Sequence, residues 1–134
     1  MAQSPPTHEG LNIMVRRKGL GLSQKELAKL LGTKQVIISK WESGERTPRY
    51  YLSMCKFFDE FENRLLEVVD SLISLAEASD CSEVAYPMYV DQEDYEKLCI
   101  YAKKLPWLSM YRQAVAWAAM SVREGGQTSY AELI

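Results

Sequence analysis

The chain has 134 residues, 47% hydrophobic and 25% charged, a composition that excludes a disordered or fibrous protein and a length that excludes two full enzyme domains. Residues 1–50 carry nine basic and four acidic side chains, a net charge of +5, which leaves −7 for the remainder of a chain whose total is −2. This division favours a nucleic-acid-binding head on an acidic module, with chance surface charge as the alternative.

The sequence offers few of the features that membrane, metal or catalytic functions require. No apolar run reaches the roughly 18 residues of a membrane span, and residues 1–10 are polar, so we expect a cytoplasmic protein with no membrane partner. The one histidine, His8, lacks the partners of a catalytic dyad, so no enzymatic activity is expected. The three cysteines, Cys55, Cys81 and Cys99, are odd in number and far apart in sequence. We therefore expect reduced thiols, with no metal site or cofactor.

Two helices are predicted in the first third of the chain. The first runs from about residue 7 to residue 17 or 18. The second begins with a capping box, in which the side chains of Ser23 and Glu26 each accept from the other's backbone amide, and it ends at Gly32. In the first helix one face carries Leu11, Met14 and Val15, and in the second an inward stripe is formed by Leu27, Ala28 and Leu31.

A third short helix fits between Thr33 and Ser43, and Gly44 ends it. Its apolar side chains are Val36, Ile37, Ile38 and Trp41. Two short helices joined by a tight turn that contains glycine form a helix-turn-helix unit. The alternative is a packed three-helix unit with no nucleic-acid role.

A much longer helix is predicted from about Arg49 to Ala78. Its apolar residues alternate at spacings of three and four for more than three heptads, which is typical of a helix that packs against a partner. This seam consists of Tyr51, Met54, Phe58, Phe61, Leu65, Val68, Leu72 and Leu75. The residues expected to join two chains are Phe61, Leu65, Val68, Leu72 and Leu75. The alternative is that the last two helices of the same chain cover the seam.

The remaining residues predict one strand and two helices. A short strand is expected at residues 84–90, where Pro87 indicates a sheet edge. A helix begins with the acidic residues 91–94 and continues until Pro106 ends it. The last helix covers about residues 107–124 and is followed by a short tail.

The sequence LGLSQKELA at residues 20–28, followed by ISKWESG at residues 38–44, resembles the Cro/C1-type (XRE) helix-turn-helix family. The likeness combines residue order, spacing and the terminal Trp-Glu-x-Gly. It implies a mainly α fold with a five-helix, lambda-repressor-like head at residues 1–58. This head runs into the long helix and then into a small α-helical dimerisation module with one short strand at residues 59–134.

The resemblance also implies which residues contact DNA. The third helix, residues 33–43, would enter the major groove, and the base-reading positions would be Lys34, Gln35, Val36, Ser39 and Lys40. Core packing is the alternative for Val36. The expected phosphate contacts are Ser23, Gln24, Thr33, Arg46 and Arg49. Many relatives have Ser where this chain has Lys34, so we expect Thr33 to cap the helix.

In relatives, the positions of Arg17 and Glu42 form an ion pair, which implies a structural pair here. Family members read two half-sites about 34 Å apart as dimers. The implied partners are therefore double-stranded operator DNA and a second copy, in a homodimeric autorepressor that reads an inverted repeat. The C-terminal half has a long helix, a short strand, a helix and a final helix in that order, with RQAVA at residues 112–116 and an ending at residues 124–134. In this layout and these residues it more weakly resembles autorepressors of anti-CRISPR operons and related two-part bacterial regulators, which implies dimerisation there and, in some relatives, RNA binding.

Two other functions remain open. The first is an antitoxin, whose C-terminal part would bind a toxin and whose gene would neighbour that of the toxin. The second is a ligand-responsive sensor, with core packing as the alternative role of its aromatic residues. The aromatic residues that would line its pocket are Tyr86, Tyr89, Tyr101, Trp107 and Tyr111.

Overall fold

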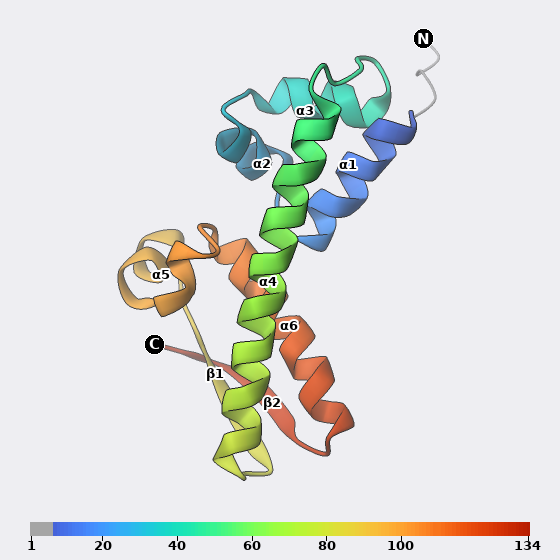
Figure 1. Cartoon of the computed structure of the whole chain (residues 1–134). Coiled ribbons are helices and arrows are strands. Elements are labelled where there is room, and N and C mark those ends of the chain that lie inside the picture. The colour runs from blue at the N-terminus through green and yellow to red at the C-terminus, as the bar shows by residue number, and fades with distance from the viewer. Residues whose placement is uncertain (1–6) are drawn as a thin grey trace. The chain divides into compact units, whose positions relative to one another are not determined.

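Figure 1 shows the computed structural model of the chain, which describes residues 7–134. The polar start considered above therefore lies partly outside the described residues. The chain forms two compact units, an N-terminal unit that ends at Phe61 and a C-terminal unit from Glu62 to Ile134. Helices predominate and the described residues contain only two strands, so the predicted mainly α fold is confirmed. None of the helices in this part of the chain is long and apolar enough to cross a bilayer.

The N-terminal unit contains three short helices and the first part of a long one. These are α1 (His8–Gly19), α2 (Gln24–Leu31), α3 (Gln35–Ser43) and α4 (Tyr51–Ser79). The predicted glycine ends are confirmed, because Gly32 and Gly44 end α2 and α3 in the left-handed conformation with φ of 70° and 81°. Only residues 44–50 separate α3 from α4, and this segment, in which Pro48 is buried, forms no further helix. The described part of the head, residues 7–58, thus contains fewer helices than the five expected.

Helix α1 does not bury the apolar face formed by Leu11, Met14 and Val15. Ile13 and Arg17 are buried, with Gly10 one turn earlier, whereas Leu11 and Val15 are 45% and 66% exposed. Apolar residues lie on several sides of α1, so their spacing did not select one face. The charged side chain of Arg17 can be buried on this face because its polar groups form hydrogen bonds inside the unit, as described below.

The C-terminal unit adds four helical or extended elements and a final strand to the second part of α4. They are β1 (Glu83–Met88), α5 (Gln92–Leu98), the 3₁₀ helix η1 (Ile100–Lys103), α6 (Leu108–Glu124) and β2 (Thr128–Leu133). The acidic start of α5 is confirmed, since the Asp91 carboxylate accepts from the backbone amide of Asp94 at 2.9 Å.

Two predictions for this unit were wrong. The helix expected to run on towards Pro106 ends at Leu98, because Cys99 is extended (φ −91°, ψ 126°) and interrupts the helical backbone before η1. The expected tail forms β2, which pairs with β1 in parallel from Glu83↔Thr128 to Met88↔Leu133. Figure 1 shows the two strands side by side. The sequence of β2, TSYAEL, does not alternate regularly between apolar and polar residues, so no strand is predicted there.

The seam of α4 is covered within one chain. Phe61, Leu65, Val68 and Leu72 are at most 8% exposed, whereas Leu75 is 60% exposed. The prediction that these residues join two chains therefore needs correction for the first four, because side chains already buried within a chain have no surface to offer a second copy. The alternative stated above, in which one chain covers its own seam, describes these four residues.

Candidate nucleic-acid interface

Helix α3 separates an exposed polar face from a buried face. Gln35, Val36 and Ser39 are exposed, at helical spacings of one, three and four, while Ile38 and Glu42 are buried on the opposite side. Val36 is 53% exposed, which excludes the core-packing alternative for its side chain. The helix therefore presents a short row of side chains that differ in hydrogen-bonding character and that a groove of DNA could contact.

The start of α3 differs from the prediction. Lys34, not Thr33, is the N-cap residue, with extended backbone (φ −106°, ψ 148°) and no side-chain cap hydrogen bond. Thr33 belongs instead to the end of α2, because its amide donates to the carbonyl of Ala28 at 2.9 Å across the left-handed Gly32. Without a side-chain cap, the first amides of α3 remain suited to an external acceptor, and exposed Lys34 lies beside them.

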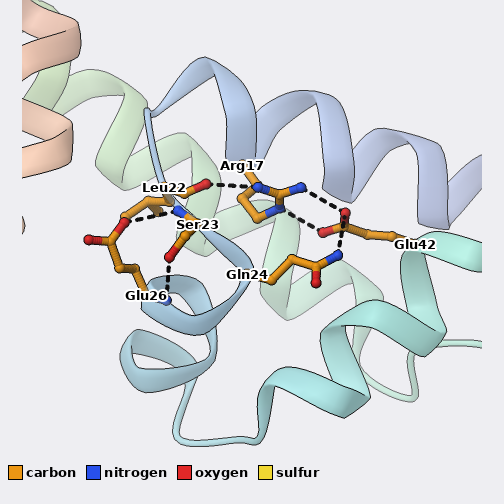
Figure 2. Close-up of polar contacts among 6 residues, drawn as sticks. All are labelled: Arg17, Leu22, Ser23, Gln24, Glu26 and Glu42. Carbon is orange, nitrogen blue, oxygen red and sulfur yellow. Dashed lines mark hydrogen bonds and ion pairs between the residues drawn. The ribbon is translucent and has the colours of Figure 1, made fainter.

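The start of α2 is fixed by the predicted capping box, which Figure 2 shows. The Ser23 hydroxyl accepts from the Glu26 amide at 3.0 Å, and the Glu26 carboxylate accepts from the Ser23 amide at 2.9 Å. Gln24 follows directly, and its side-chain amide donates to Glu42 Oε1 at 3.1 Å. Gln24 thus connects the first residue of α2 to the buried side of α3.

Arg17 and Glu42 form the centre of this polar network (Figure 2). Arg17 Nε donates to Glu42 Oε2 at 2.7 Å and its terminal nitrogen donates to Oε1 at 2.9 Å, the parallel double hydrogen bond typical of arginine with a carboxylate. The other terminal nitrogen donates to the carbonyl of Leu22 at 2.8 Å. One guanidinium therefore ties α1 to α3 and to the residues that lead into α2.

Burial makes this pair structurally important. Arg17 is 8% exposed and Glu42 is 4% exposed, and the carboxylate accepts three hydrogen bonds in total. Each ion would cost several kcal/mol to bury alone, so the two must be present together. The arrangement fixes the orientation of α3 relative to α1 and α2, and with it the direction of the exposed face.

Basic side chains flank the exposed face of α3. Arg46 and Arg49 lie in the segment after α3, and both are exposed. The amide of Arg46 donates to the carbonyl of Lys40 at 3.1 Å, which holds this segment against the last turn of α3. Lys40 itself is half-buried. These groups give the surface the positive charge that phosphate contacts need.

Sequence reasoning missed a second set of contacts that brace α1. Arg16 donates to Asp59 Oδ1 at 2.5 Å, and its guanidinium carbon lies 5.3 Å from the centre of the Phe58 ring. Asn12 donates to the hydroxyl of Tyr51 at 2.5 Å. No local pattern could have indicated these contacts, because the partners lie 43 and 39 residues apart in sequence.

The C-terminal unit contains an open cavity of about 500 Å³, and four of the five aromatic residues expected around a pocket line it: Tyr86, Tyr89, Tyr101 and Tyr111. Two of their hydroxyls already hold the unit together, since Tyr86 donates to the carbonyl of Leu72 at 3.2 Å and Tyr111 donates to that of Pro87 at 2.6 Å. Burial raises the pKa of Tyr89 to about 12, so its hydroxyl stays neutral. These tyrosines thus contribute to packing, and a ligand-sensing role remains a hypothesis.

Residues 13–51 match a helix-turn-helix protein family. The match begins inside α1 and ends at the first residue of α4, so it contains the Arg17–Glu42 pair and the whole of α3. No curated protein matches the chain.

Proposed function

We propose that this chain is a homodimeric repressor that reads an inverted repeat through α3. The premise is that residues 13–51 form a helix-turn-helix domain of the Cro/C1 (XRE) type, the domain of a DNA-binding regulator. The observation that carries this proposal is the division of α3 into two faces. The Arg17–Glu42 pair fixes the inner face, while Gln35, Val36 and Ser39 are exposed.

The exposed side chains of α3 suit different base edges in the major groove. Gln35 would pair with the N6 and N7 atoms of adenine, and Lys34 or Lys40 would donate to guanine. Val36 would contact a thymine methyl group, and Ser39 would accept or donate beside it. A short ordered sequence of bases would therefore form one half-site.

Phosphate contacts would come from residues around this face. Arg46 and Arg49 are exposed and basic, and the first amides of α2 and α3 have no acceptor within their own helices, although the Glu26 amide donates to the Ser23 hydroxyl. The side chains near those starts are Ser23, Gln24 and Thr33. One N–H of the Gln24 side-chain amide already donates to Glu42, so the second N–H and the backbone amide are the donors available to a phosphate. These contacts position the head without specifying bases.

One head makes few base contacts, so useful specificity requires two. A twofold-symmetric pair of heads reads an inverted repeat whose half-site centres lie about 34 Å apart, one turn of DNA. Bound over its own promoter in the cytoplasm, such a dimer would repress transcription by occupying the DNA.

The test is fluorescence anisotropy with the protein's own upstream DNA and a shuffled duplex at one fixed salt concentration. Tight binding to the upstream DNA alone, lost in a Gln35→Ala, Lys40→Ala variant, is expected. Lys103→Ala, an exposed lysine of the C-terminal unit, is the charge-matched control and should bind as the unmodified chain does. Equal weak binding to both duplexes would contradict the proposal and favour an antitoxin or an RNA-binding regulator.

A further inference from the structure

Strand β2 has an open edge. Within residues 7–134 it pairs only with β1, and all of its side chains are exposed except that of Ser129, which is half-buried. Tyr130 and Leu133 are 53% and 65% exposed. Parallel strands usually lie covered on both faces, and two strands alone are marginally stable in water. The sheet therefore lacks the neighbours that such a pair normally has.

The backbone of β2 identifies which groups are directed outward. The amide of Thr128 donates to Ser82 at 2.9 Å and that of Ile134 donates to Met88 at 3.0 Å, so the even-numbered residues of β2 bond to β1. Because bonding alternates along a strand, Ser129, Ala131 and Leu133 direct their N–H and C=O groups away from β1.

The two outer edges of the sheet differ in how they are protected. In β1, Pro87 lies among the residues that face away from β2, and proline has no amide hydrogen to donate there. The sequence of β2 contains neither proline nor lysine, the residues that commonly block an edge, and its single charge is Glu132. Only the β2 edge is therefore open to a further strand.

We propose that β2 pairs in antiparallel orientation with β2 of a second copy of this chain, across a twofold axis, to form the four-stranded sheet β1-β2-β2-β1. This inference rests on the proposed function in that it names the surface of the homodimer. A second copy is the occupant that the strand favours, because an edge that pairs with itself closes the assembly and leaves no further edge. Pairing would also cover Tyr130 and Leu133 in part.

The chemistry of the strand selects one register. In an antiparallel pair, residues that bond outward oppose one another, so Ala131 opposes Ser129, Ala131 or Leu133 of the second copy. Centring the pair on Ala131 matches residues 128–134 with their counterparts over the whole strand. It also places Glu132 opposite Tyr130, whereas a pair centred on Glu132 would bring two carboxylates together.

A cysteine crosslink tests this register. Two alpha carbons of an opposed bonded pair lie about 5.5 Å apart, within the span of a disulfide. Ala131→Cys in a Cys81→Ser background should form a covalent dimer on mild oxidation. Ala85→Cys in the same background is the control: it is exposed on β1, and in the proposed sheet its two copies would lie about 14 Å apart. A dimer that fails to crosslink through residue 131 overturns the register and the pairing.

A second pair of variants tests the pairing of β2 without a crosslink. Ala131→Pro removes an outward amide and leaves the amides that donate to β1 in place. It should weaken dimerisation by about tenfold or more in sedimentation experiments, whereas Ala131→Val should not. An Ala131→Pro variant as dimeric as the unmodified chain, or an unmodified chain that is monomeric, overturns the inference.

DNA binding separates the failure of this inference from the failure of the proposed function. If the Ala131→Pro variant and the unmodified chain bind the inverted repeat equally tightly, the dimer forms elsewhere and the inference alone is wrong. If the unmodified chain binds no upstream DNA, the proposed function is wrong, whatever the crosslink shows.

Discussion

The alpha carbon of Gly10 in α1 packs directly against the backbone carbonyl of Trp41 in α3, and a beta carbon at residue 10 would overlap that oxygen. Gly10→Ala should therefore force α1 away from the helix that carries the exposed face. We expect a loss of about 1–3 kcal/mol in the free energy of unfolding of the N-terminal unit, the usual cost of overpacking. Chemical denaturation, with hydrogen exchange of residues 8–43 to localise the effect, measures it.

The matched control is Gly19→Ala, because nothing lies within 4 Å of a beta carbon at this last residue of α1. Alanine favours a helix over glycine by up to about 1 kcal/mol, so this variant should be neutral or slightly more stable. Equal destabilisation by both substitutions would show that the contact with Trp41 does not limit residue 10.

The buried ion pair predicts an asymmetric response to substitution. Arg17→Met and Glu42→Gln each leave one polar partner uncompensated inside the unit and should each cost about 3–5 kcal/mol. The double variant Arg17→Met, Glu42→Gln removes both charges and should be less destabilised than the sum of the two single changes. Denaturation of all three variants checks this, and additive losses would argue against a coupled pair.

Base contacts and phosphate contacts should respond differently to salt. Arg46→Ala and Arg49→Ala should weaken binding to every duplex and should each reduce the slope of log K against log salt by about one. Gln35→Ala should leave that slope unchanged and relax the preference at one base pair by about 1–3 kcal/mol. Anisotropy titrations over a series of salt concentrations, with single-base operator variants, separate the two effects. A salt slope that falls with Gln35→Ala would assign it to the phosphates.

The C-terminal unit should lose stability in alkali. Tyr89, Tyr95 and Tyr111 form a ring cluster with centroids 5.5–5.8 Å apart, and burial raises the pKa of all three phenols. Because the folded pKa values lie above the unfolded value of about 10, the neutral phenols stabilise the unit fully below pH 10. This contribution is lost as pH rises from about 10 through the folded values.

Thermal unfolding followed by circular dichroism between about pH 9 and pH 11.5, with tyrosinate absorbance, measures this loss. The comparison is Tyr95→Phe, which removes one phenol and its hydrogen bond to the carbonyl of Leu105. Its melting temperature should be lower at neutral pH but should fall less steeply in alkali. An unchanged slope would show that Tyr95 does not contribute to the pH dependence.

Local signals explain why the head was largely predictable. The capping box of Ser23 and Glu26 and the glycine ends of α2 and α3 each act within a few residues, so the sequence alone indicates them. The helix α3 starts one residue later than predicted, because the amide of Thr33 donates to the carbonyl of Ala28 in α2. This hydrogen bond depends on the left-handed conformation of Gly32, which the sequence pattern did not specify. The buried face of α1 includes Arg17, which pairs with Glu42. The family resemblance indicated this pair, but the spacing of apolar residues in α1 did not.

The C-terminal unit depended on contacts that no local pattern encodes. The parallel pairing of β1 with β2 joins residues 45 positions apart, from Glu83 with Thr128 onward, and β2 has no hydrophobic alternation of its own. The heptad seam of α4 correctly indicated that a partner covers the helix, but hydrophobic spacing cannot tell a partner in the same chain from one in a second chain.

The two faces of α3 also bear on how this head could change its target. Stability depends on Ile38, Glu42 and the guanidinium of Arg17, whereas the side chains of Gln35, Val36 and Ser39 are exposed and make no hydrogen bond within the described part of the chain. Substitutions at these three positions leave the inner face untouched. The same scaffold could therefore acquire a new operator through a few surface changes, whether by natural divergence or in a library in which only these positions vary.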